Sequence, residues 1–171
     1  RLHRGAQGTA GDLGHVAALH GGDTRCTCGN LGCLEAVASG PAIVRALRER
    51  GVDLQDSSDL VRLAKAGDLA AATAIRDAGR EIGHVLATCV SLLNPSVIVV
   101  GGRLAQSAES LLAGIREVVY GRSLPLATGD LQIVASRTAG HAGVIGAATM
   151  VVQHVLSVEQ VEHQLAAAAA G

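Results

Sequence analysis

The sequence is almost without aromatic side chains. It has no Trp and no Phe, and Tyr120 is its only Tyr. Hydrophobic residues nevertheless make up 49% of the 171 positions, so a sizeable core must be filled by Val, Leu, Ile and Ala. This composition argues against single-stranded nucleic-acid binding of the kind that stacks bases on aromatic rings.

An excess of charge of either sign is also missing. The formal net charge is -1 and the basic residues form no stripe, which makes the chain alone a poor DNA binder. No apolar run is long enough to predict a membrane span, and the start shows no signal-peptide pattern. Because the sequence opens with Arg1 rather than Met, we expect it to be a piece of a longer protein.

Cysteine is scarce but clustered. Three of the four cysteines, Cys26, Cys28 and Cys33, lie within eight positions, and His15 precedes them by eleven residues. Such a cluster fits a metal site better than a disulfide scaffold and predicts a reducing, cytoplasmic location. Three thiolates and one imidazole suit tetrahedral zinc, and four protein ligands leave no open position, so the predicted zinc is structural. The alternative is a set of free buried thiols with an unrelated His15.

The order of patterns along the chain predicts an α/β fold with a helical insertion. The uninterrupted apolar run Val97–Val100 is typical of a strand buried on both faces of a parallel sheet. A second strand is predicted over Leu131–Ala135, a core helix over His141–Leu156, and an earlier strand over His15–Leu19. The expected regions are a zinc and sugar loop, a mainly helical part, an α/β part and a helical or frayed tail, at residues 1–35, 36–93, 94–156 and 157–171.

The predicted ligand His15 has a second chemical consequence. If one ring nitrogen binds zinc, the other carries a proton and can only donate. A fixed donor beside carboxylates can recognise a polyol, and Glu35 and Asp12 are the nearest candidate acceptors in sequence. The alternatives are an ordinary first-turn helix carboxylate for Glu35 and a loop cap for Asp12. Cys89, on the apolar face of a predicted helix, is expected to be a core residue.

Two segments carry a resemblance to a known family. Gly11–His15 followed by Cys26–Glu35 resembles the signature of the ROK family, a name that covers bacterial repressors, uncharacterised frames and sugar kinases. Asn94-Pro95, the strand to Val100 and the segment Gly140–Ala148 are similar too. Nearly the whole chain thus looks like the family's C-terminal half. The resemblance implies an actin-like, ribonuclease-H-like fold in which a zinc ion held by three Cys and one His orders the sugar-binding loop.

The same resemblance assigns roles to individual residues. It implies that Asp12, His15 and Glu35 contact sugar hydroxyls. It also implies that Gly101 and Gly102 match the region that approaches the adenosine of ATP in kinase members, although an ordinary strand-to-helix glycine turn is an alternative. Kinase members usually have Glu where this chain has Asp12, so the sugar contact is expected to be altered here.

The function expected from these features is that of a sugar-sensing effector domain of a ROK-type transcriptional regulator. The ligand would be a sugar or amino sugar, and DNA would be bound only through an N-terminal module outside this sequence. The alternatives are the C-terminal lobe of an ATP-dependent, glucokinase-like sugar kinase, with ATP bound only in that case, and a zinc-stabilised interaction domain. In the family the catalytic aspartate and phosphate loop lie in the other half, so no phosphoryl transfer is expected from this chain alone. An Ala/Leu/Val-rich helical insertion predicts a homo-oligomer.

Overall fold

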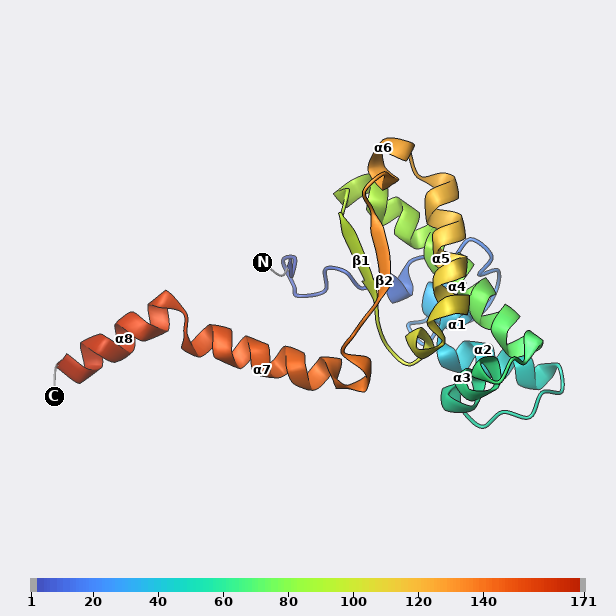
Figure 1. The fold of residues 1–171 in the computed structure, drawn as a ribbon, viewed down its shortest axis with the longest axis horizontal. Helices are drawn as coiled ribbons and strands as arrows, with labels where there is room; N and C mark the ends of the chain where they lie inside the picture. Colours follow the sequence, from blue (N-terminus) through green and yellow to red (C-terminus); the bar gives the residue numbers. More distant parts are fainter. Residues whose placement is uncertain (1–2, 170–171) are drawn as a thin grey trace. The chain divides into compact units, whose positions relative to one another are not determined.

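Two long helices, α4 (Leu69–Leu93) and α5 (Ala108–Arg122), lie side by side beside a small parallel sheet (Figure 1). The structure, a computed structural model, describes residues 3–169. It divides into two units, residues 1–136 and 137–171. The other elements of the first unit are η1 (Leu13–His15), α1 (Leu34–Ala38), α2 (Gly40–Glu49), α3 (Ser57–Lys65), β1 (Val97–Val100), η2 (Leu104–Ser107), α6 (Pro125–Thr128) and β2 (Gln132–Ala135).

Side-chain caps start the helices of the predicted helical part. The Ser39 hydroxyl accepts a hydrogen bond from the Ala42 N–H at the start of α2. Asp56 and Asp68 cap α3 and α4 in the same way, and each such cap typically contributes about 1 kcal/mol. Helix α4 ends at Asn94, which takes the left-handed conformation with φ 42° directly before a proline.

The sheet confirms the predicted α/β class but not the predicted burial. Strands β1 and β2 pair in parallel, with Val97 opposite Gln132 and Val100 opposite Ala135. Val97 and Val99 are nevertheless 46% and 61% exposed, whereas Ile98 is half-buried. The prediction of a strand buried on both faces is therefore wrong for this unit, because its helices cover one face of the sheet only.

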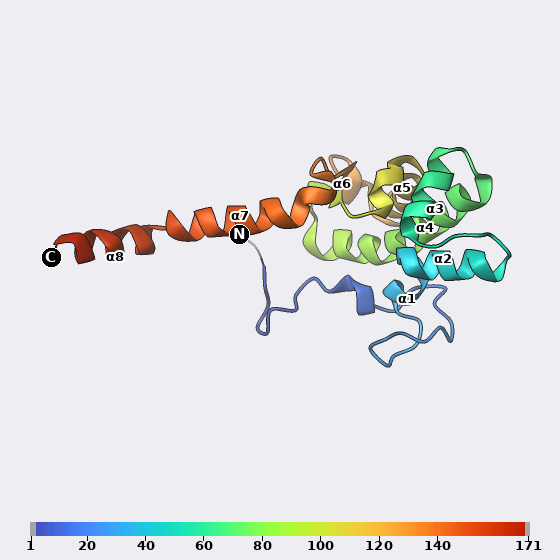
Figure 2. The same ribbon diagram turned by 90° about the horizontal axis from the view of Figure 1, so that it is seen from below.

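The predicted strand over His15–Leu19 is also wrong. Residues 13–15 form the 3-10 turn η1, and only Ala17 makes an isolated bridge, to Cys33. The segment before α1 lies along one side of α4 and α5 lies on the other (Figure 2). The segment before α1 therefore meets the layer of helices at α4.

Helices α4 and α5 meet through glycines. A Cβ added to Gly114 would overlap the carbonyl oxygen of Arg76, and one added to Gly79 would overlap that of Leu111. Around this contact Ile75 and Ile115 are fully buried. The core without Phe or Trp is thus closed by bringing two helix backbones together rather than by large side chains.

The second unit contains η3 (Ala139–His141), α7 (Ala142–Val155) and α8 (Val158–Ala169). Helix α7 begins and ends within one residue of the predicted core helix, but it has no buried residue. The prediction that it is a core helix is not met within this unit, because a stretch of 35 residues supplies no layer that faces it. Residues 170 and 171 of the predicted tail lie outside the described residues.

Membrane-spanning potential can be judged for residues 3–169. No single helix there is long and apolar enough to cross a membrane. Only α7 and α8 taken together, as a bent pair over Ala142–Val155 and Val158–Ala168, reach the necessary length and composition.

The glycine contact yields a stability prediction. We expect Gly114→Ala to destabilise the protein by about 1–3 kcal/mol, because the added methyl group overlaps backbone atoms that cannot rotate away. The matched control is Gly121→Ala on the same helix, where an added Cβ meets nothing within 4 Å. This control should stabilise by about 0.5–1 kcal/mol. Urea unfolding of both variants measures the two effects, and equal effects would contradict the packing argument.

Candidate metal centre and sugar site

A tight hairpin brings the three clustered cysteines together. Its two sides are joined by the bridge Arg25–Leu31 and by a hydrogen bond of 2.9 Å from the Cys26 N–H to the Asn30 carbonyl. The Leu34 N–H donates to the Val16 carbonyl at 2.9 Å, which ties the hairpin to the residues after η1. His15, at the end of η1, is thereby placed beside the cysteines.

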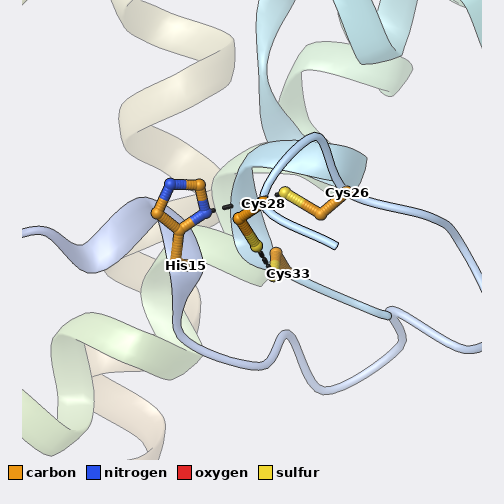
Figure 3. A group of neighbouring side chains, drawn as sticks. All are labelled: His15, Cys26, Cys28 and Cys33. Carbon is orange, nitrogen blue, oxygen red and sulfur yellow. Dashed lines mark hydrogen bonds between the residues drawn. The ribbon is translucent and has the colours of Figure 1, made fainter. Parts of the chain in front are cut away.

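The four predicted metal ligands converge on one point. The Cys28 and Cys33 sulfurs are 3.7 Å apart, and the Cys26 sulfur is 3.6 Å from the Nδ1 atom of His15 (Figure 3). All four ligand atoms lie within 4.8 Å of one another. Around tetrahedral zinc, bond lengths of about 2.3 Å to sulfur and 2.0–2.1 Å to nitrogen give separations of about 3.8 and 3.6 Å. The cluster could therefore hold a metal ion with little rearrangement.

The surroundings of Cys26 and Cys33 shift the pKa values of their thiols in opposite directions. Hydrogen bonding from the backbone N–H of Cys28 stabilises the Cys26 thiolate and lowers its pKa to about 7. Burial raises the pKa of Cys33 to about 12, so a cation is needed to hold this residue as a thiolate. The contact with the Cys26 sulfur, with smaller contributions from Asp12 and Glu35, raises the pKa of His15.

The three predicted sugar contacts lie around the same point. Asp12 Oδ1 and Glu35 Oε2 are 3.5 Å and 3.6 Å from the position that a Cβ would take at Gly14. The His15 side chain follows directly in sequence, and both carboxylates act on it electrostatically. Asp12 makes no side-chain cap to η1, so the loop-cap alternative is not observed there. Glu35 does lie in the first turn of α1, as its helix-dipole alternative requires.

Thr27 was missed by the sequence interpretation. Its hydroxyl donates a hydrogen bond to Glu35 Oε1 at 3.3 Å, and the Cys26 sulfur lies 3.9 Å from the same oxygen. No spacing rule indicates this contact, because it depends on how the hairpin folds over the first turn of α1.

Two pockets border this region. One, of about 390 Å³, is lined by Glu35, Thr27 and the basic residues Arg25 and Arg45, among others. A larger hollow of about 510 Å³ lies between the residues around η1 and α4, and Cys89 lines it. Cys89 is half-buried, so the prediction that it belongs to the core is met only in part.

The predicted ATP-approaching glycines lie at the carboxyl end of β1. Gly102 has φ +95°, a conformation that favours glycine. This end of a parallel sheet is where ligands bind in open α/β folds. The turn by itself accounts for Gly102, so a role of Gly101 and Gly102 toward ATP stays a prediction.

The position of the hairpin generates a prediction about order. We expect Cys28→Ser to increase amide hydrogen exchange over residues 20–35 while β1 keeps its protection. The reason is that Cys28 is exposed and outside the apolar core, so its sulfur can stabilise only the hairpin. Cys89→Ser on α4 is the control and should leave exchange in residues 20–35 unchanged. Loss of protection throughout β1 in Cys28→Ser would show instead that the hairpin stabilises the whole fold.

Comparison with known proteins identifies the family. The chain matches the ROK family over residues 1–154. It is 32% identical to a glucokinase from Thermotoga maritima, covering 90% of this chain and 53% of that one. It is also 32% identical to an N-acetylglucosamine repressor from Escherichia coli O157:H7, covering 96% and 42%. The chain thus spans about half the length of the curated relatives that it matches.

The fold agrees with this match. A solved structure of a ROK family glucokinase from Streptomyces griseus, in complex with glucose and AMPPNP, superposes with a TM-score of 0.75 at 30% identity. The superposition covers 88% of this chain and 54% of that one. Solved structures of a ROK family transcriptional regulator and of a ROK family glucokinase both share the α/β fold of this chain, as the resemblance predicted. The chain belongs to the ROK family.

Proposed function

We propose that this chain is the sugar-sensing effector domain of a ROK-type transcriptional regulator, with a structural zinc ion that orders the sugar-binding loop. The observation that carries the proposal is the convergence of Asp12, His15 and Glu35 around Gly14, directly beside the Cys/His cluster. A sugar or amino sugar bound there would bias the orientation of a DNA-binding segment elsewhere in the protein.

Zinc is the metal that this ligand set favours. Three soft thiolates with one imidazole exclude hard cations such as Mg²⁺ and Ca²⁺, which prefer oxygen. The sulfurs of Cys28 and Cys33 are 3.7 Å apart and form no disulfide with each other, so both are available as thiolate ligands. Reduced thiols agree with the expected cytoplasmic location.

The geometry supports a division of roles among the sugar contacts. His15 faces Cys26 through Nδ1, which leaves the Nε2 proton free to donate to a sugar hydroxyl. Asp12 and Glu35 each place a carboxylate oxygen beside Gly14, next to His15 in sequence, where they can act as acceptors. A polyol, whose hydroxyls both donate and accept, matches such a set.

The alternative is the C-terminal lobe of an ATP-dependent sugar kinase. The glucokinase relative and the solved glucokinase structure favour it, and Gly101 and Gly102 lie at the sheet edge where a nucleotide would approach. Asp12, where kinase members usually have Glu, favours the regulator. A third alternative is a zinc-stabilised interaction domain that binds no sugar. The expected homo-oligomer is a separate prediction, and both can be tested with the same protein preparations.

The sugar contacts can be tested in the full-length protein. We expect Glu35→Gln to weaken sugar binding by about tenfold to a hundredfold, because it removes a charged acceptor that Thr27 already orients. Asp12→Asn should weaken sugar binding less, because the shorter Asp12 side chain suits a contact with the sugar through a water molecule. Calorimetric titration with glucose, xylose and N-acetylglucosamine measures both, with Glu49→Gln on α2 as an exposed control.

The zinc content of each variant must be checked, so that loss of the loop is not mistaken for loss of a contact. If Asp12→Asn abolishes binding and Glu35→Gln does not, the assignment of the main acceptor is wrong. If neither variant changes binding of a sugar that the wild type binds, the sugar site lies elsewhere. If the wild type binds none of the three sugars, the alternative of an interaction domain that binds no sugar is favoured.

A kinase assay can distinguish the regulator from the kinase lobe only when it is carried out on the full-length protein. We expect the 171-residue chain to show no sugar kinase activity, because phosphoryl transfer depends on positioning between two lobes and the chain spans about half of its relatives. A coupled assay with ATP and glucose measures this. Turnover that scales with chain concentration and survives repurification would contradict the expectation. The same assay on the full-length protein then tests the kinase alternative directly.

A further inference from the structure

A second group of metal-ligating side chains lies between the zinc loop and α4. His20 comes from the loop, and Glu81 and His84 come from α4. One ligand atom from each lies within 4.8 Å of the others. We propose that His20, Glu81 and His84 form a second metal site, separate from the Cys/His cluster, for zinc or a similar divalent transition metal. This proposal does not depend on sugar binding.

The helix and the loop approach each other closely here. Glu81 and His84 are three residues apart, so their side chains leave the same face of α4. The backbone N–H of His20 donates to Glu81 Oε2 at 3.2 Å, and its Nδ1 lies 2.5 Å from Glu81 Oε1. The rings of His20 and His84 are 6.0 Å apart between centroids and inclined at 68°. Contacts across 61 residues of sequence therefore place two imidazoles and a carboxylate together.

A simple His–Glu hydrogen bond is the alternative interpretation. It explains His20 and Glu81 but gives His84 no role. Two imidazoles with one carboxylate are a ligand set that holds zinc in sites with an open position, and imidazole favours zinc, nickel and copper over magnesium or calcium. The set thus has the composition of a transition-metal site and not only of an ion pair.

The distances allow a metal to be bound by side-chain rotation alone. Ligand atoms around a four-coordinate zinc lie about 3.3–3.5 Å apart, given bonds of about 2.0–2.2 Å. The His20 and Glu81 atoms, now 2.5 Å apart, must separate to this distance and any wider pair in the 4.8 Å set must close to it, each by about an ångström. The His20 side chain is 72% exposed and can rotate, whereas the Glu81 side chain is 15% exposed and is held by the backbone N–H of His20.

Three protein ligands leave one coordination position open. His84 also lines the hollow of about 510 Å³ between the residues around η1 and α4. Water or a small oxygen ligand from this hollow could complete the coordination. One carboxylate leaves a divalent ion with a net positive charge, so an anionic oxygen ligand is favoured. Metal binding would also join the loop to α4 at a point five residues after His15.

Cobalt titration tests the site. The 171-residue chain, without a polyhistidine tag and with one equivalent of zinc in the Cys/His cluster, is titrated with Co²⁺ while visible absorption is recorded. We expect one further equivalent with ligand-field bands but no thiolate charge-transfer band, because the site contains no sulfur. Glu81→Gln, His84→Asn and His20→Asn should each weaken this binding by about tenfold or more. The control His154→Asn, on α7, should leave it unchanged.

Circular dichroism melts of each variant show whether it is folded. Glu81→Gln keeps the shape of the side chain, so the test remains decisive even if His84→Asn does not fold. The proposal is overturned if the wild type takes up no second equivalent. It is also overturned if cobalt binds only with a thiolate band, which means exchange into the cluster, or if Glu81→Gln binds cobalt as tightly as the wild type.

Discussion

The close approach of α4 and α5 is the constraint on which the rest of the structure depends. Without Phe or Trp, no large side chain is available to fill the space between two separated helices. The backbones meet instead at Gly79, Gly83 and Gly114, where backbone or side-chain atoms of the facing helix occupy the space that a Cβ would need. Helices α1, α2 and α3 pack on α4, and α4 also presents Glu81 and His84 to the loop. An unusual composition thus determines the position of the surface on which the candidate sites lie.

The loop before α1 is held by a different kind of interaction. Among residues 3–33 only Leu13 and Ala18, both partly buried, pack against the apolar core. Its shape comes from backbone hydrogen bonds across the hairpin, from the convergence of thiols and imidazole, and from the contact of His20 with Glu81. Such polar links are directional, so they can fix side chains within the tolerance that sugar recognition needs. If the cluster binds the proposed zinc ion, the order of the loop will also depend on that metal, a dependence that apolar burial would not create.

The sequence predicted what local rules determine. The apolar run at Val97–Val100 and the predicted helix over His141–Leu156 match observed elements to within one residue at each end. The Cys/His spacing together with the glycines led to the family. Burial of β1 could not be predicted, because it depends on layers that other segments supply. His20 and Glu81 lie 61 residues apart, and a Glu and a His three residues apart on a helix are too common to indicate a site. Tertiary contacts alone bring them together.

The family relationship explains why regulator and kinase are hard to separate on this half of the protein. A glucokinase and an N-acetylglucosamine repressor align over nearly all of the chain at equal identity. What these residues encode is therefore compatible with either role, and solved structures of a ROK regulator and a ROK glucokinase share the α/β fold of this chain. The proposed recognition of a sugar by Asp12, His15 and Glu35 would require neither DNA nor ATP, so such a site could serve either role. The outcome of binding would then depend on the part of the protein to which this half is coupled, and the proposed effect of Asp12 is confined to how the ligand is held.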